Sequence, residues 1–445
     1  MDIFHYPKSS NDSLILEKLV NNIKMNIKKN TKTNNLVLLN NNQKSLFINL
    51  IKNISNYYSD IILKIKYNIY DNLNEYEINN IKNINNDYLN NRFIPNKLKE
   101  NIQKNIYKYN KLIVFTYNNY DVTFLLQYSN TNEINKIFNK IYILAVRSLI
   151  INILFCNLQS IRYNIILSDL KKSKTIKTKI LSPNEINTGS TLAIGYKPIN
   201  IWRKEELVKV GIHELIHCLR FDIKNYPTDL LKMYYDNFCI ETNNCNFDDY
   251  YNCSNLIFPN EAYTESIAQI FNCLFKEIEY SKLLKYNNNN NIYNKFINNL
   301  EKELIYGLFQ VKKILNLYKF NSFKDFIKSN KCPSTLVQQT NVFSYFFIRT
   351  SILFNLSGFL DLLNTNENIQ NTNENIQNIP ELRIKNNYNI IKKYTLFNIK
   401  NLKNKNFNKL IELYNKDINT IINKKFNNNE IKIINNNLRM SIIEF

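Results

Sequence analysis

The sequence predicts an α+β protein in which a small mixed sheet lies on one side of a central helix and a helical region lies on the other. The strand-like patterns all lie before residue 203, and helical periodicity of apolar residues dominates after it. Segregation of strands from helices is typical of the α+β class. Hydrophobic residues make up 44% of the 445 residues, which is enough for a sizeable core.

The first half of the chain supplies the predicted sheet. Residues 1–105 are rich in Asn and Lys and are expected to be mostly helical. Residues 111–127 read as two apolar strands around Asn118 and Asn119, which predicts a β-hairpin. A strong apolar stripe predicts a helix over 132–158, and two short strands are expected at 163–167 and 199–202.

The second half is expected to be helical. Helices are predicted at 204–220, 261–274, 301–319 and 342–354. The pure Asn tract at 287–291 is expected to be a surface loop. The heptapeptide NTNENIQ at 364–370 is repeated identically at 371–377, which indicates a disordered insert. The chain is therefore divided into four parts: an N-terminal region (1–105), a core (106–360), the insert (361–379) and a C-terminal helical region (380–445).

Charge and apolar runs indicate which partners to expect. The net charge of +21 comes mostly from Lys scattered along the chain, which favours compositional bias over a dedicated nucleic-acid surface. The most apolar run, 141–155, contains Arg147 and is too short to span a bilayer. We expect no specific nucleic-acid partner and no membrane association, and the sequence leaves the oligomeric state open.

The cysteines indicate the compartment. Their number is odd and they form no Cys-x-x-Cys pair, which favours reduced thiols in a cytosolic protein over a disulfide framework. The seven are Cys156, Cys218, Cys239, Cys245, Cys253, Cys273 and Cys332. A second metal site at 239–253 is conceivable, but the spacing matches no zinc finger and loop cysteines are favoured. No apolar segment follows the N-terminus, so a cytoplasmic location is expected.

Two of the three histidines fall in one motif, His213-Glu214-Leu215-Ile216-His217. Residues four apart share a helix face, so both imidazoles can bind one Zn²⁺ while Glu214 reaches a water at the metal. The alternative is a buried helix whose histidines are merely packed. The remaining histidine, His5, is remote from the motif.

A catalytic zinc site needs a third protein ligand, and the chain has no histidine after His217. Carboxylates are the candidates. Glu261 and Glu265 lie four residues apart just after Pro259, on a helix whose apolar residues indicate burial. Buried acids need partners, which a metal and a ligand histidine would supply. The alternative is a solvated acidic face.

The motif at 213–217 together with Asn260-Glu261-Ala262-x-x-Glu265 resembles the gluzincins, the thermolysin-like zincin metallopeptidases. The resemblance implies a zincin-like fold, Glu261 as the third zinc ligand and Glu265 as the residue that orients a ligand histidine. It implies Glu214 as general base in peptide hydrolysis and a peptide or protein as substrate.

Two further expectations follow from this resemblance, each with an alternative. The strand at 199–202 occupies the position that pairs with substrate in zincins, and an ordinary sheet strand is the alternative. No histidine is available as oxyanion donor, so Tyr345 and Arg349 are the first candidates, on a polar stripe that also contains Asn341. Tyr263, inside the helix of Glu261, is the other candidate. The alternative for this stripe is that it faces solvent or a carboxylate. For the whole protein, the alternative is a non-catalytic zincin fold with a structural or binding role.

The composition and two short stretches are also similar to uncharacterised His-Glu-x-x-His proteins of large DNA viruses. The stretches are Asn187-Thr188-Gly189 and residues 202–206. This second resemblance implies that the protein would be found in the host cytoplasm or the virion.

Overall fold

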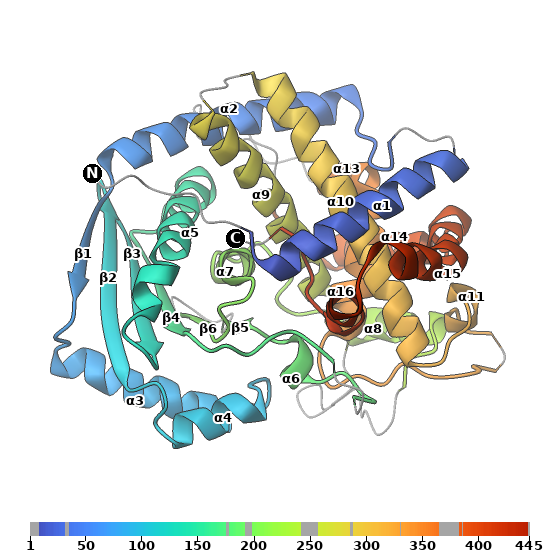
Figure 1. Cartoon of the computed structure of the whole chain (residues 1–445). Helices are drawn as coiled ribbons and strands as arrows, with labels where there is room; N and C mark the ends of the chain where they lie inside the picture. The colour runs from blue at the N-terminus through green and yellow to red at the C-terminus, as the bar shows by residue number, and fades with distance from the viewer. Residues whose placement is uncertain are drawn as a thin grey trace.

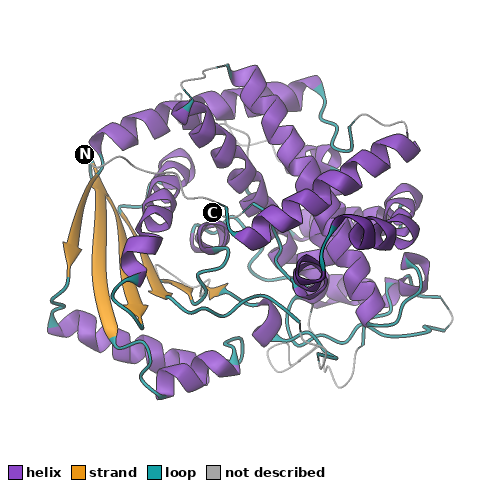
Figure 2. Cartoon of the chain, viewed as in Figure 1, coloured by secondary structure: helices purple, strands orange, loops and turns teal. Residues whose placement is uncertain are grey.

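The protein was analysed as a computed structural model (Figure 1). It describes residues 9–31, 35–174, 178–191, 198–241, 257–284, 288–329, 331–364, 382–384 and 386–443. Helix α7 (Leu207–Cys218) lies at the centre, with the sheet and α5 (Glu133–Phe155) on one side and α9 (Pro259–Leu283) and α10 (Asn289–Leu317) on the other. The expectation of an α+β protein with a small mixed sheet is confirmed (Figure 2).

The sheet is mixed, and its strand order is β1-β2-β3-β4-β6-β5. Strands β1, β2 and β3 are antiparallel, β3, β4 and β6 are parallel, and β5 is antiparallel to β6. The bounds are β1 Lys66–Tyr70, β2 Tyr109–Tyr117, β3 Tyr120–Tyr128, β4 Ser160–Ile166, β5 Gly189–Ser190 and β6 Ile199–Ile201.

The predicted hairpin is confirmed as β2 and β3, with Tyr117 paired to Tyr120. Asn118 in the turn has φ 53°, a left-handed conformation that Asn tolerates. Strand β1 was not predicted, because it lies inside a region whose pattern indicates helices. All five of its residues are exposed, so it carries no alternation of buried and exposed residues that would indicate a strand.

Helices cover both faces of the sheet. On one face, α5 packs against β3 and α7 packs against β6 and β5, and the two helices also contact each other. On the other face, α3 (Glu75–Asn90) and α4 (Asn96–Gln103) form a small apolar cluster with Leu125, Ile166 and Trp202. The central helix thus contacts the sheet both directly and through α5.

Among the described residues, α5 is the single unbroken helix long and apolar enough to cross a membrane. In its most apolar window, 72% of the residues are buried inside the protein, which is the property of a core helix. A second candidate passes the same test only as a pair bent by 88°.

The remaining helices form the helical part of the molecule (Figure 1). One apolar cluster includes side chains of the N-terminal helices, the sheet, α7 and the C-terminal helices. The bounds are α1 Asn11–Thr31, α2 Asn41–Lys64, α6 Pro183–Ile186, α8 Thr228–Asn237, α11 Phe323–Phe326, the π-helix η1 Phe343–Ile348, α12 Arg349–Phe354, α13 Leu356–Asn364, α14 Tyr388–Leu402, α15 Lys405–Lys425 and α16 Asn428–Asn436.

Two expectations about local structure need correction. The Asn tract is not simply a loop: Asn288 caps α10, accepting hydrogen bonds from the backbone of Asn290 and Asn291, as Asn favours at helix starts. The insert begins later than expected, because residues 361–364 complete α13. The rest of the predicted disorder at 365–379 lies outside the described residues.

The expectation of reduced thiols is wrong for one pair of cysteines. Cys239 and Cys332 form a disulfide across 93 residues of sequence, and spacing along the chain cannot reveal such a pair. Three cysteines, Cys156, Cys218 and Cys273, are free thiols. The other two, at 245 and 253, lie outside the described residues, and with them the possible metal site there.

The C-terminal segment, residues 437–443, is buried along its whole length. It lies against the start of α7, where Arg439 pairs with Glu205 and the Ser441 amide donates to Glu206 Oε1. From the other side, Glu303 of α10 accepts from the Ser441 hydroxyl and from two backbone amides. This segment therefore joins the start of the central helix to α10.

Candidate metal centre

Helix α7 places the motif inside the protein. It begins after Glu206, at φ 57°, and residues 207–217 are all buried. Gly211 allows close contact with α5, since a Cβ there would lie 2.5 Å from the Leu144 Cδ2 atom. The opposite helix face carries His213 and His217, whose Nε2 atoms are 3.2 Å apart.

Helix α9 supplies the third donor atom. Glu261 Oε2 lies 3.3 Å from His213 Nε2 and 3.4 Å from His217 Nε2. These three atoms are called the donor triangle below. In the part of the chain that the structure describes, these residues form the one cluster of three or more His, Cys, Asp or Glu side chains with donor atoms close enough to hold a metal ion.

The donor triangle has the dimensions of a tetrahedral zinc site. Bonds of 2.0–2.2 Å at tetrahedral angles place two ligand atoms about 3.3–3.5 Å apart. The edges of the triangle are 3.2, 3.3 and 3.4 Å. Two imidazoles and one carboxylate are also a donor set that zinc prefers, and they leave one tetrahedral position for a fourth ligand.

A carboxylate contacts the Nδ1 atom of each histidine ring, on the side away from the donor triangle. His213 Nδ1 lies 2.9 Å from Glu265 Oε2, and His217 Nδ1 lies 2.8 Å from Asp222 Oδ2. A carboxylate at Nδ1 fixes the proton there and leaves the Nε2 lone pair free. The two Nε2 lone pairs and the Glu261 oxygen therefore converge on one point.

The pKa values show what charge this arrangement favours. Burial alone would lower the pKa of His213, but hydrogen bonds to Glu261 and Glu265 raise it above its ordinary value. Burial likewise opposes the rise at His217, where Asp222 and Glu261 raise the pKa well above normal. Burial would raise the pKa of Glu261, yet the two histidines hold it far below its usual range. The centre of the triangle thus favours positive charge, which protons or one divalent cation can supply.

Glu214 lies on α7 beside the donor triangle and is 6% exposed. Burial raises the pKa of its carboxyl group, while the two histidines oppose the rise. Its side chain lies against Gly189 of β5, where a Cβ atom would come within 2.7 Å of Glu214 Oε1. Glycine at this position therefore leaves room for the carboxylate.

Tyr345 and Arg349 do not share one site. The Tyr345 hydroxyl donates to Glu261 Oε2 at 2.9 Å, so it lies at the donor triangle. Arg349 is fully buried and donates to Gln269 Oε1 and the Met440 carbonyl. The expectation that Arg349 faces a hydrated cleft is wrong. Tyr345 lies level with Glu261, whereas Arg349 lies level with Gln269, two helical turns further along α9, where the C-terminal segment covers it.

The strand expected to pair with substrate is not at the edge of the sheet. Strand β6 pairs with β4 through Ile199–Ile201 and with β5 through Asn200 and Ile201. Both of its sides are therefore occupied, and β5 is the edge strand. The alternative, that 199–202 is an ordinary sheet strand, describes β6 correctly.

Asp222 and Lys209 also belong to this site, although the sequence did not single them out. Lys209 precedes His213 by one helical turn and pairs with Glu265, and that spacing is a usable signal. Asp222 follows the end of α7. Arg220 there has φ 58°, and the resulting reversal of the chain brings Asp222 back to His217. Nothing in the residue types around Arg220 predicts such a reversal.

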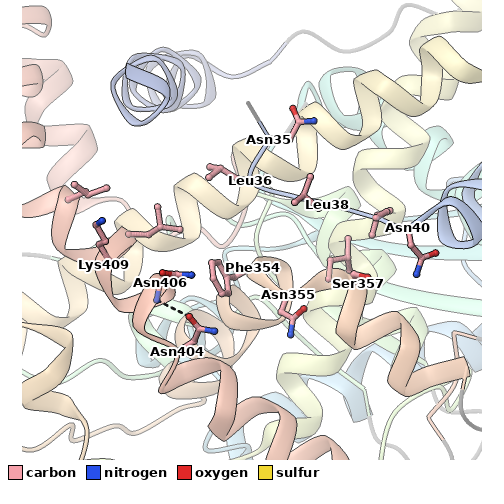
Figure 3. Close-up of a pocket in the computed structure, with 14 residues that line it drawn as sticks. Asn35, Leu36, Leu38, Asn40, Phe354, Asn355, Ser357, Asn404, Asn406 and Lys409 are labelled. Atoms are coloured by element: carbon pink, nitrogen blue, oxygen red, sulfur yellow. Dashed lines mark hydrogen bonds between the residues drawn. The ribbon is translucent and has the colours of Figure 1, made fainter. Parts of the chain in front are cut away.

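A separate cavity of about 880 Å³ lies in the helical part. Figure 3 shows its lining, which includes Leu36, Leu38 and Phe354. One polar group at its wall stabilises a helix end: the Asn404 side chain accepts a hydrogen bond from the amide of Asn406 at the start of α15. None of the residues that line this cavity belongs to the donor triangle.

Comparison with known proteins gives one distant relation. The chain is 25% identical over 210 residues to an uncharacterized protein of Acanthamoeba polyphaga mimivirus. The match covers 46% of this chain and 49% of the mimivirus protein, so the chain spans about half the length of that relative. No family model and no solved structure matches. The similarity therefore supports a relation to a protein of a large DNA virus, and it does not indicate an activity.

Proposed function

We propose that the protein is a zinc-dependent metallopeptidase of the gluzincin type. The observation that carries this proposal is the donor triangle, with edges of 3.2–3.4 Å and a buried carboxylate, Glu214, beside it. His213, His217 and Glu261 would hold the metal, and Glu265 and Asp222 would orient the two imidazoles. The place of α7, between the sheet and the helical part, supports a zincin-like arrangement.

Each of these residues has a defined part in the proposed reaction. Bound zinc supplies Lewis acidity, which polarises a carbonyl and lowers the pKa of water. Glu214 accepts a proton from the water that attacks the scissile carbonyl carbon and delivers it to the leaving amine nitrogen. The Tyr345 hydroxyl donates to the oxygen that becomes negative. Strand β5, at the sheet edge beside Glu214, is suited to bind an extended peptide.

A non-catalytic zinc protein is the second candidate. A structural site closes its coordination with a fourth protein ligand and has no use for a neighbouring general base. Among the residues that the structure describes, three converge on the donor triangle, and Gly189 leaves room for Glu214. Both features favour catalysis.

The direct test is metal analysis of the purified protein, followed by cleavage of a peptide library with and without chelator. We expect about one zinc per chain, loss of cleavage on chelation and recovery when zinc is added back. Protein without bound zinc would contradict the metal site. A full equivalent of zinc without cleavage of any peptide would favour the non-catalytic candidate.

Asp222→Ala is expected to weaken zinc binding about 10–100-fold, because the His217 ring loses the carboxylate that orients it. Competition with a chromophoric chelator measures the change in the dissociation constant. Asp229→Ala is the matched control, since that exposed acid bonds to Tyr388 on α14 and should leave zinc affinity unchanged. Wild-type affinity in Asp222→Ala would show that the hydrogen bond to His217 does not support the metal.

Tyr345→Phe is expected to lower kcat by roughly 10²–10³-fold, as for loss of one oxyanion donor. Zinc content and melting temperature should be unchanged, because the ring and its packing remain. Steady-state kinetics and metal analysis of the same preparation decide the outcome. If zinc affinity fell while the kcat of the zinc-loaded variant was unchanged, the hydroxyl would instead serve to position Glu261.

A further inference from the structure

A buried lysine lies behind the donor triangle. Lys209 is on α7, one turn before His213, and its ammonium group contacts Glu265 Oε1. The side chains of Lys209 and Glu265 are 2% and 1% exposed. Lysine and glutamate are almost never buried to this degree unless they are paired, so each requires the other in this position.

The two carboxylate oxygens of Glu265 contact two different residues of α7. Oε1 contacts Lys209, and Oε2 lies 2.9 Å from His213 Nδ1. Residues four apart lie on the same helix face, so Lys209 and His213 present one surface of α7 to one side chain of α9. The carboxylate therefore bridges the lysine and the imidazole.

The contacts continue through the donor triangle without a break. Along α7 the order is Lys209, His213 and His217, and along α9 it is Glu265 and Glu261. Glu265 lies between Lys209 and His213, and Glu261 lies between the two histidines. Lys209 is thus the outermost member of the row that ends at the metal-binding atoms.

We propose that Lys209 is a positioning residue for the metal centre, acting through Glu265 on His213. Its charge keeps the buried carboxylate in place, and the carboxylate holds the His213 ring with Nε2 directed at the donor triangle. The inference rests on the zinc binding proposed above. It extends that proposal to a residue that would touch neither metal nor substrate.

A second buried lysine provides the matched control. Lys172 is 1% exposed and pairs with Glu206 at 2.9 Å, and Glu206 is fully buried. This ion pair lies at the start of α7, but Glu206 is bonded to the Ser441 amide of the C-terminal segment. Lys172 therefore matches Lys209 in burial and in pairing with an acid. It lies close enough to interact with the charges of Lys209 and Glu265, but its ion pair is with Glu206 rather than with the carboxylate that contacts His213.

The test measures zinc affinity and melting temperature for Lys209→Met, Lys172→Met, Glu265→Gln and the double variant Lys209→Met/Glu265→Gln. Methionine keeps most of the lysine volume without its charge. Lys209→Met should weaken zinc binding about 10–100-fold, and Lys172→Met, which removes a nearby charge but no contact of Glu265, should weaken it much less. Because Lys209 acts through Glu265, the double variant should bind zinc no more weakly than Glu265→Gln alone.

Three outcomes would overturn the inference. One is wild-type zinc affinity in Lys209→Met, and another is an equal loss in Lys209→Met and Lys172→Met. The third is a full additional loss in the double variant, which would show that Lys209 acts by another route. If Lys209→Met does not fold, the double variant, which buries no unpaired charge, still allows comparison with Glu265→Gln. Absence of zinc from the wild-type protein would instead contradict the proposed metal site itself.

Discussion

Glu214→Gln is expected to abolish peptide hydrolysis and to leave a full equivalent of zinc in place. The amide has nearly the size of the carboxylate, so it fits the space beside Gly189, but it cannot accept the proton of the attacking water. Loss of general-base catalysis should lower kcat by roughly 10²–10⁴-fold. Steady-state kinetics and metal analysis on the same preparation check both halves of this expectation.

The control for this variant is Glu277→Gln. Glu277 is also a buried glutamate, but it accepts a hydrogen bond from Asn299 on the neighbouring helix α10. Its replacement should leave kcat unchanged. Wild-type turnover in Glu214→Gln would refute the mechanism, and loss of zinc from that variant would show that Glu214 supports the metal instead.

His213→Ala and His217→Ala are each expected to remove stoichiometric zinc. Each substitution takes away one corner of the donor triangle, and two remaining protein ligands are too few for a zinc site of this kind. Metal analysis after dialysis measures the loss. His5→Ala is the matched control, because it removes the third histidine of the chain and should leave the zinc content intact.

Among the acids, Glu261→Ala should be as severe as loss of a histidine. Glu265→Ala should cost only about 10–100-fold in zinc affinity, since it removes the partner of a ligand rather than a ligand. A full equivalent of zinc in either histidine variant would contradict the site. Loss of zinc in Glu265→Ala together with its retention in Glu261→Ala would reverse the assignment of the two acids.

Much of the site follows from spacing within single helices. His213 and His217 are four residues apart, as are Glu261 and Glu265, and such pairs share a face in any α-helix. The approach of α7 to α9 could not be read from the sequence, because it depends on how both helices pack in the core. The sequence therefore indicates which atoms can bind a metal, and the fold brings them within 3.4 Å of each other.

The expectations that needed correction, and the acid that was missed, depended on tertiary contacts and on local departures from regular structure. Tyr345 contacts Glu261, whereas Arg349 contacts Gln269, two turns further along α9, and the C-terminal segment that covers it. Asp222 reaches His217 only because Arg220 adopts a left-handed conformation. Strand β6 was expected at the sheet edge, but the two-residue strand β5 pairs with it and takes the edge position. None of these local departures has a pattern that periodicity can detect.

The burial of the C-terminal segment has a consequence for synthesis. The contact between Ser441 and Glu206 joins residues 235 positions apart, so the ribosome has made α7 and α9 long before their partner emerges. At about 5–20 residues per second this delay is roughly 10–50 seconds. During that time Glu205 and Glu206 lack the segment that covers them in the folded protein. Helix α7 therefore reaches its final environment only after residues 437–443 have been made, so completion of the candidate metal centre would be separated in time from synthesis of the motif.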